Sequence, residues 1–420
     1  MAPGNDPSEF FKAFLFINIF RAFRMAIHSR KMVIAFIAVL LVSLSGWAMD
    51  VSKTVSVDDQ GRSELDTYLQ QTDQAPSFLE KTDLHGGHTG VFETLVRFGV
   101  KRFENSLDAL KEFDVTTLFV VFDNLGQGFK ALEWAFMYHL IYSSVFFAIT
   151  LAVSSVAGGA ICRMAALEFA QNERPGLMES LRFGCTRFRS LFAAPLTPIV
   201  IVALIGSSIL LLGLLGNIDY AGELLVGLFM PLVLISGMLM MLVVLGALGG
   251  INLMFPTIAF ENSECFTAVN NSFRYVFARP WRLGVYTAVA LVYGGISYAL
   301  VRFFVFGLLL TCYRFLQLGF LEGNLKLERL WAEPRFESLF TPVAVETSVW
   351  TERVGAFLIH TGVMSVVGLM AAFVVSYCFS ANTIIYALIR NRVDGTDLSQ
   401  VASVYEDDDE DDFLLCPEKS

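Results

Sequence analysis

Apolar segments long enough to cross a bilayer alternate with short cationic segments along most of this chain. A helix needs about 20 mostly apolar residues to span the hydrocarbon core of a membrane. Six segments meet or approach this length and contain no Asp, Glu, Lys or Arg. We therefore predict about six transmembrane helices, at residues 32–49, 134–162, 191–216, 224–250, 283–301 and 354–389.

Amphipathic helices are predicted next to several of these spans. Residues 1–31 include Asp-Pro-Ser-Glu at positions 6–9, a typical helix start, and continue with phenylalanines and basic residues at helical spacing. Residues 255–282 have a similar pattern and lead directly into the fifth span. A helix with one aromatic and one basic face lies in the plane of the membrane surface. We therefore expect interfacial helices at both places.

The distribution of Lys and Arg among the loops sets the orientation, because cytoplasmic loops carry the excess of these residues. Connections 163–190 and 255–282 are rich in arginine, whereas loop 50–133 is acidic. Both termini are therefore predicted to be cytoplasmic. The predicted parts are an N-terminal cytoplasmic interfacial helix (1–31), a first span (32–49), an extracytoplasmic acidic loop with an amphipathic helix in its second half (50–133), a five-helix transmembrane core (134–389) and an acidic cytoplasmic tail (390–420).

The composition agrees with a membrane protein. Of the 420 residues, 55% are hydrophobic and only 17% are charged, which is too apolar for an ordinary soluble domain. The sequence thus predicts an all-α polytopic membrane bundle. The net charge of -10 comes largely from the acidic run 406–412 and from loop 50–133, so nucleic-acid binding is disfavoured. The six cysteines show neither a disulfide framework nor zinc-ligand spacing.

Eight arginines are predicted to form a cationic collar at the inner leaflet, where each adds on the order of 1 kcal/mol of attraction to anionic headgroups. The eight are Arg21, Arg24, Arg182, Arg187, Arg189, Arg274, Arg279 and Arg282, and Arg30 and Lys31 near the first span are expected to extend the collar. Residues 23–31, 181–189 and 272–282 resemble one another. Two explanations remain open: convergence under the positive-inside preference, and a threefold helical-hairpin repeat.

Small residues recur every four positions along the sixth span. They are Gly368, Ala372, Ser376 and Ser380. Small side chains let helix backbones approach closely in lipid, so we predict a helix-packing seam here. Its partner is either another helix of this chain or a second copy in a homo-oligomer.

One cluster outside the predicted spans has residue types that bind metals. His85 and His88 lie in a Gly-rich turn, with Asp83 and Glu93 nearby. Solvated histidines in a turn explain the same pattern, and we expect no metal and no other cofactor.

Three ionisable residues fall within or near predicted spans. His139 and His360 lie near the outer ends of their spans, and we expect interfacial anchors rather than a proton or substrate path. Arg302 lies about one bilayer thickness beyond Arg282 at about 1.5 Å per residue. We predict that Arg302 is an anchor at the outer interface and that its charge is not buried.

Glu261 lies near the cytoplasmic end of the fourth span. It is expected to cap the following surface helix or to pair with Arg274, Arg279 or Arg182. We predict a structural role for it.

Two stretches resemble known membrane families. Pro256-Thr257-Ile258-Ala259-Phe260-Glu261, with Ser272-Phe273-Arg274 and Trp281-Arg282, resembles the membrane domain associated with some bacterial glycerophosphodiester phosphodiesterases. Residues 380–390, followed by Asp394-Gly395-Thr396-Asp397, resemble the end of an uncharacterised multi-pass family common in planctomycete-type bacteria. This sequence has no His-Arg pair followed by acidic metal ligands, the motif that would mark the catalytic barrel of the phosphodiesterases. The resemblance therefore implies a fold and a bacterial inner-membrane location, with no chemistry.

The sequence shows no nucleophile beside a base, no phosphate-binding glycine loop and no convergent carboxylate pair. We therefore expect a non-enzymatic integral membrane scaffold or accessory subunit that contacts proteins and anionic lipid. A small-solute transporter or channel built from helical hairpins is the alternative. A membrane-embedded lipid enzyme is the third possibility.

Overall fold

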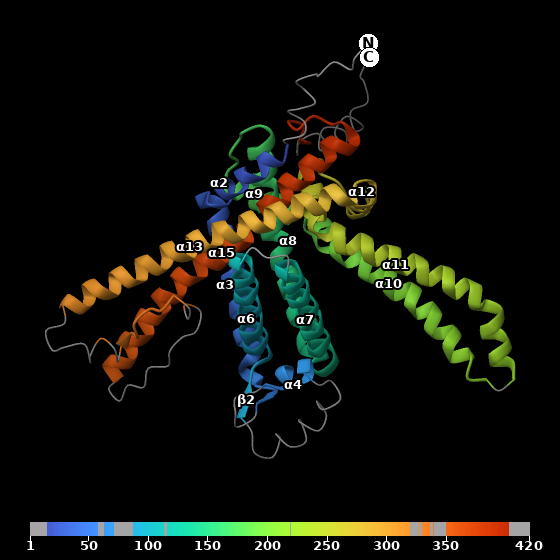
Figure 1. The fold of residues 1–420 in the computed structure, drawn as a ribbon, viewed down its shortest axis with the longest axis horizontal. Helices are drawn as coiled ribbons and strands as arrows, with labels where there is room; N and C mark the ends of the chain where they lie inside the picture. Colours follow the sequence, from blue (N-terminus) through green and yellow to red (C-terminus); the bar gives the residue numbers. More distant parts are fainter. Residues whose placement is uncertain are drawn as a thin grey trace, which may run out of the picture. The chain divides into compact units, whose positions relative to one another are not determined.

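The computed structural model describes residues 15–57, 63–70, 87–112, 116–218, 220–319, 327, 330–336, 339 and 350–402. Within these ranges the chain is almost entirely helical (Figure 1). In the described residues, six helices are long and apolar enough to cross a membrane: α3 (Ser29–Met49), α8 (Leu140–Ala170), α10 (Phe188–Leu215), α11 (Ala221–Glu261), α13 (Pro280–Gly319) and α15 (Trp350–Asp394). The predicted all-α polytopic fold is confirmed, and the protein is a multi-pass membrane protein.

Three of the spanning helices are much longer than the apolar segments that predict them. Helices α11, α13 and α15 have 41, 40 and 45 residues. At about 1.5 Å per residue, each is about twice as long as the hydrocarbon core is thick. Part of each helix therefore extends beyond the core, as where α15 continues through Arg390 and Arg392 to Asp394.

The chain divides into two compact units. The first unit comprises Met1–Ala35, Ser154–Leu291 and Val375–Ser420, and the second comprises Phe36–Val153 and Val292–Val374. Helices α3, α8, α13 and α15 each contribute residues to both units.

The first unit repeats one local arrangement three times. A short helix ends in a break of one or two residues, and a spanning helix follows at once. The short helices are α2 (Arg21–Ala26) before α3, α9 (Leu177–Thr186) before α10 and α12 (Cys265–Ala278) before α13. Each spanning helix is followed along the chain by another spanning helix, α8, α11 or α15. This order is expected under both explanations of the sequence similarity, because successive spans alternate in direction in any multi-pass protein.

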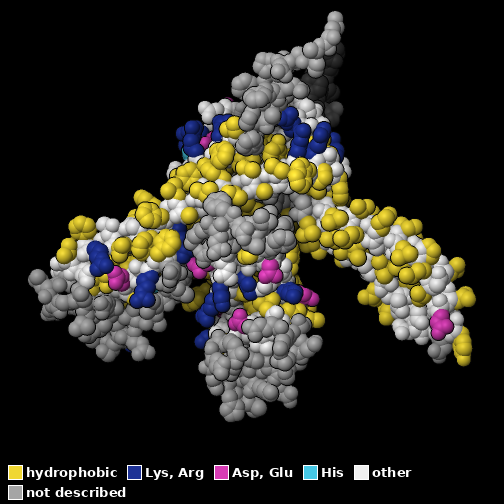
Figure 2. Space-filling view, viewed as in Figure 1, with side chains coloured by type: hydrophobic (Ala, Val, Ile, Leu, Met, Phe, Trp, Pro, Cys, Tyr) yellow, Lys and Arg dark blue, Asp and Glu magenta, His cyan; other side chains and the backbone are white. Residues whose placement is uncertain are grey.

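Helices α10 and α11 pack side by side as a hairpin (Figure 1). Large apolar side chains cover the visible face of this hairpin (Figure 2). At its base, α8, α9, α10, α11 and α12 share a buried apolar cluster. Its members are Cys162, Phe183, Leu191, Ala194, Met254, Ile258, Ala259, Ala268 and Val269.

The second unit contains the part of loop 50–133 that the structure describes. A short 3-10 helix, η2 (Asp50–Ser52), follows α3, and strand β1 (Val55–Val57) pairs antiparallel with β2 (Gly87–Thr89). Helices α4 (Glu64–Gln70), α6 (Val91–Glu112) and α7 (Thr116–Tyr138) complete the loop. The amphipathic helix predicted in its second half corresponds to α6. The second span was predicted from residue 134, but the structure ends α7 at Tyr138 and begins α8 at Leu140.

Asp50 fixes the start of α6. Its carboxylate oxygens accept the backbone N–H groups of Phe92 and Glu93, at 3.0 and 2.8 Å, and the hydroxyl of Tyr142 at 2.6 Å. The first N–H groups of a helix have no partner within the helix, and a carboxylate there also favours the helix dipole. Gly90 makes room for this contact, because a Cβ at that position would lie 2.0 Å from Cγ of Asp50.

Candidate lipid-facing interface

All eight predicted collar arginines lie in the first unit, on α2, α9 or α12, in the breaks that follow α9 and α12, or at the starts of α10 and α13. Seven of them are exposed, and Arg187 is half-buried. Lys and Arg side chains gather around α2, α9 and α12 (Figure 2). The three related segments therefore present their positive charge on one unit.

Large apolar side chains lie exposed beside these arginines. Met178 on α9 and Phe266 on α12 are each 76% exposed, and Trp281 between Arg279 and Arg282 is 83% exposed. An exposed tryptophan between two arginines suits the headgroup level of a membrane, where its ring is amphipathic and the cations meet phosphates.

The short helices α9 and α12 are amphipathic and bury their other face. Helix α9 buries Ser180, Phe183 and Gly184, and a Cβ at Gly184 would lie 2.4 Å from the carbonyl oxygen of Val156 in α8. Helix α12 buries five residues, among them Tyr275. This packing holds the arginines on the outer faces of both helices.

Two collar arginines also bind polar groups of the first unit. The Nε of Arg187 donates to Oδ1 of Asn262 at 2.7 Å, and Arg274 donates to Oδ2 of Asp394 at 2.9 Å. Tyr275 donates its hydroxyl to the same carboxylate of Asp394. Burial and this hydrogen bond raise the pKa of Tyr275 to about 12, so the hydroxyl keeps its proton at neutral pH. No ion pair within the described part of the chain involves Arg182, Arg279 or Arg282.

Lys31 does not belong to the exposed collar, contrary to the sequence-based prediction. Its Nζ lies 2.7 Å from Oε2 of Glu168, and the two side chains are 1% and 8% exposed. Arg30 remains exposed and donates to the backbone carbonyls of Arg174 and Pro175, at 2.9 and 2.7 Å.

Glu261 has the predicted structural role but a different cationic partner. Its carboxylate accepts the Tyr386 hydroxyl and Nδ2 of Asn271 at 2.8 Å, and Nε of Arg390 lies 3.6 Å away. Pairing with Arg274, Arg279 or Arg182 is therefore wrong. The partner comes instead from the end of α15, which packs on the end of α11.

Arg163 is a buried arginine that the sequence placed only in a cationic connection. It is 5% exposed, and it donates to the carbonyl oxygens of Ala259 at 2.8 Å and Ala402 at 2.9 Å. Its guanidinium lies 5.2 Å from the ring centroid of Phe183. The sequence offered one signal for this burial. Residues 154–160, just before Arg163, are mostly small, and small residues let neighbouring helices pack closely around the end of a span.

The seam residues of α15 pack against helices of the same chain. In the second unit, a Cβ at Gly368 would lie 3.0 Å from the ring of Phe36. In the first unit, Ser376 donates to the carbonyl oxygen of Ala26 at 2.8 Å. Ala372 and Ser380 are fully buried. The sequence left open whether the seam packs on this chain or on a second copy. The contacts of Gly368 and Ser376 are with helices of the same chain.

Arg302 differs from the prediction of an unburied charge. It is 8% exposed, lies 3.2 Å from Oε1 of Glu104 and donates to the carbonyl oxygen of Phe336 at 2.8 Å. Helix α6 and residues 330–336 cover it, and its charge is neutralised by pairing.

The predicted histidine sites do not form a metal centre in the described residues. His85 lies outside them, and His88 is exposed in β2. No group of three or more His, Cys, Asp or Glu among the described residues could hold a metal ion. His360 is exposed on α15.

His139 lies in the break between α7 and α8, where burial lowers its pKa. Its Nε2 is 3.9 Å from Oε2 of Glu64, and its ring packs edge-on against Trp134 at 5.2 Å between centroids. Trp134 in turn donates its Nε1–H to Glu64 at 3.1 Å.

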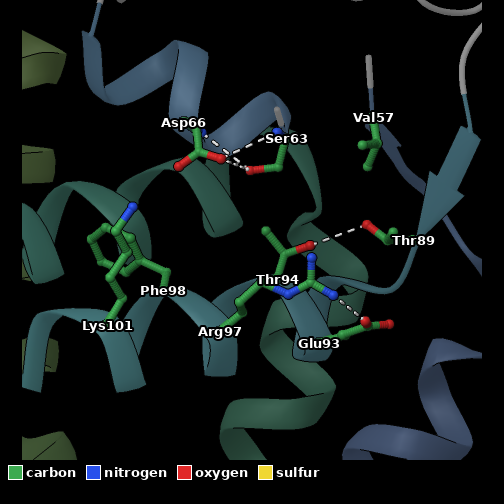
Figure 3. A pocket seen from close by; sticks show the side chains of 9 residues that line it. All are labelled: Val57, Ser63, Asp66, Thr89, Glu93, Thr94, Arg97, Phe98 and Lys101. Carbon is green, nitrogen blue, oxygen red and sulfur yellow. Dashed lines mark hydrogen bonds and ion pairs between the residues drawn. The ribbon is translucent and has the colours of Figure 1, made fainter. Parts of the chain in front are cut away.

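The second unit also contains a polar pocket of about 220 Å³ (Figure 3). It is lined by Val57, Ser63, Asp66, Thr89, Glu93, Thr94, Arg97, Phe98 and Lys101. Its charged groups are largely paired with each other or with neighbouring hydroxyls, as in the 2.6 Å contact between Arg97 and Glu93. This mixed lining does not favour one ligand class.

Comparison with protein families, curated proteins and solved structures gives no match for this chain. The function proposed below is therefore argued from the exposed arginines and apolar side chains of the first unit.

Proposed function

We propose that this protein is a non-enzymatic scaffold or accessory subunit of the bacterial inner membrane that binds anionic headgroups through its cationic collar. The observation that carries this proposal is the joint exposure of arginines and large apolar side chains on α9 and at the start of α13. The attraction of each exposed arginine to an anionic surface is on the order of 1 kcal/mol. Seven such residues are sufficient to hold the surface helices against an anionic membrane.

The test removes collar charges that form no ion pair with another described residue. The variant Arg182→Gln, Arg279→Gln, Arg282→Gln is reconstituted in bilayers that mix zwitterionic and anionic lipid, and the anionic lipid held around the protein is measured with spin-labelled lipids. We expect a loss of anionic-lipid preference that is largest at low ionic strength, because salt screens exposed charges. The matched control is Arg97→Gln, Lys101→Gln, Arg314→Gln, which removes three exposed cations from the second unit. An unchanged preference in the collar variant would overturn the proposal.

A small-solute transporter is the second candidate, and the three repeated helix–break–span arrangements favour it. The same collar variant separates the two functions. In sealed vesicles, a transporter gated by these helices would show altered uptake of anionic solutes with unchanged lipid preference. We expect the reverse: altered lipid preference and no change in uptake.

A further inference from the structure

Residues 400–402 are hydrogen-bonded to the end of α11 and to two arginines of the first unit. The backbone N–H of Ala402 donates to the carbonyl oxygen of Phe260 at 2.8 Å. Its own carbonyl oxygen accepts a hydrogen bond from Arg163 at 2.9 Å, and Arg163 also binds Ala259. Arg390 adds a hydrogen bond to the carbonyl oxygen of Gln400 at 2.9 Å. Three hydrogen bonds to Gln400 and Ala402 therefore hold the end of the described chain at α11.

This place adjoins the part of the collar carried by α9 and the start of α10. The guanidinium that holds Ala402 lies 5.2 Å from the ring of Phe183, the sequence neighbour of Arg182. Asn262, two residues beyond Phe260, accepts the hydrogen bond from Arg187. Ala402 is thus connected through Arg163 to the helix that carries Arg182, and through the end of α11 to the start of α10.

Seven consecutive acidic residues, 406–412, follow Ala402 after a short connection. An extended chain covers at most about 3.3–3.6 Å per residue. The acidic run therefore begins within roughly 15 Å of Ala402. A tethered partner of opposite charge has a high effective concentration at its site. An anionic membrane, in contrast, repels the acidic run and attracts the same arginines.

We propose that the acidic run 406–412 binds the exposed Arg182 and Arg189 of this chain, and that anionic headgroups displace it. The displacement half of this inference rests on the proposed lipid-binding function, whereas the binding half does not. The collar would then be covered next to neutral lipid and open next to anionic lipid.

Two native cysteines allow a direct test. Cys185 is exposed on α9 between Arg182 and Arg187, and Cys416 lies four residues after the acidic run. The test protein keeps these two and buried Cys162, and carries Cys265→Ser, Cys312→Ser and Cys378→Ser. In zwitterionic bilayers at low salt, a short bifunctional thiol reagent should link Cys185 to Cys416 within one chain. If the substituted protein does not fold, the same link is mapped by mass spectrometry in the unaltered chain.

Three changes should each reduce the yield of the link several-fold: neutralisation of residues 406–412 to Asn and Gln, high salt, and incorporation of anionic lipid. The matched control moves the first cysteine to the α10–α11 turn (Cys185→Ser, Asn217→Cys) and should give no link. A yield no higher than in this control, or one insensitive to neutralisation of the acids, would overturn binding of the tail. A product of twice the monomer mass would assign the acidic run to a second copy and contradict the intramolecular proposal.

The cross-linking yield in anionic lipid, compared with the anionic-lipid preference of the protein, distinguishes failure of the tail proposal from failure of the proposed function. A link that forms and survives anionic lipid would leave tail binding intact and refute displacement. Normal anionic-lipid preference with no link would leave the scaffold function intact and refute the role of the tail.

Discussion

Lys31 and Glu168 form a buried ion pair, 2.7 Å between Nζ and Oε2, that joins the start of α3 to the end of α8. The two side chains are 1% and 8% exposed, so each charge depends on the other for compensation. Removing one partner of a buried pair leaves an uncompensated charge, whereas replacing both with apolar residues of similar size is often tolerated.

We predict that Lys31→Met lowers the free energy of unfolding by about 3–5 kcal/mol. The double variant Lys31→Met, Glu168→Leu should recover most of this loss. Denaturant unfolding in detergent measures both, and Arg24→Ala, which removes an exposed cation from α2, should change stability by less than about 1 kcal/mol. Equal losses in the single and double variants would show that the pair is net stabilising.

The contact between α9 and α8 requires glycine at position 184. A Cβ there would lie 2.4 Å from the backbone oxygen of Val156, which cannot rotate away as a side chain could. We predict that Gly184→Ala costs about 1–3 kcal/mol, as overpacking does elsewhere, and lowers anionic-lipid preference because α9 shifts. Gly206→Ala is the matched control, since nothing lies within 4 Å of a Cβ at that helical position. It should be neutral or stabilising by up to about 1 kcal/mol, and a similar loss in both variants would refute the steric argument.

Burial lowers the pKa of His139, so the folded second unit keeps this imidazole neutral to lower pH than the unfolded chain does. The unfolded state therefore binds the proton first as pH falls through about 6.5. We predict that protection of α7 against hydrogen exchange, corrected for the intrinsic rate, falls below this pH and levels off below the folded pKa. His139→Gln should abolish the dependence, and exposed His360→Gln should leave it unchanged. Protection that increases on acidification would mean that protonated His139 pairs with Glu64.

The orientation of the chain stays a prediction that thiol labelling can decide. With both termini cytoplasmic, a membrane-impermeant maleimide on intact cells should label Arg97→Cys, because the Arg97 side chain is 68% exposed on α6. It should not label exposed Cys185 on α9 or Cys416 in the tail until the membrane is permeabilised. Labelling of Cys185 in intact cells would invert the topology.

Local patterns in the sequence were enough to locate the spanning helices and the surface helices. Uncharged apolar runs must lie in lipid or in a core, and arginines spaced along an amphipathic helix must face outward. These properties depend on residues within one or two turns of each other, as in α9, α12 and Trp281. The exposed collar follows from the same reasoning.

Contacts between distant residues needed the tertiary structure. Lys31 looks like one more basic residue beside Arg30, and only the approach of Glu168, 137 positions away, shows that it is buried. Arg163 likewise differs from the exposed arginines because Ala259, 96 positions away, and Ala402, 239 positions away, lie against it.

The sequence by itself therefore determined that this protein is an all-α membrane protein with about six spans and a set of basic, aromatic surface helices. The tertiary structure decided which charges stay on the surface and which are paired inside, that Glu261 faces Arg390, and that the small-residue seam of α15 packs within the chain. The physical reason is range: hydrophobic periodicity is a local property, whereas the partner of a buried charge or a small residue is set by how distant helices pack together.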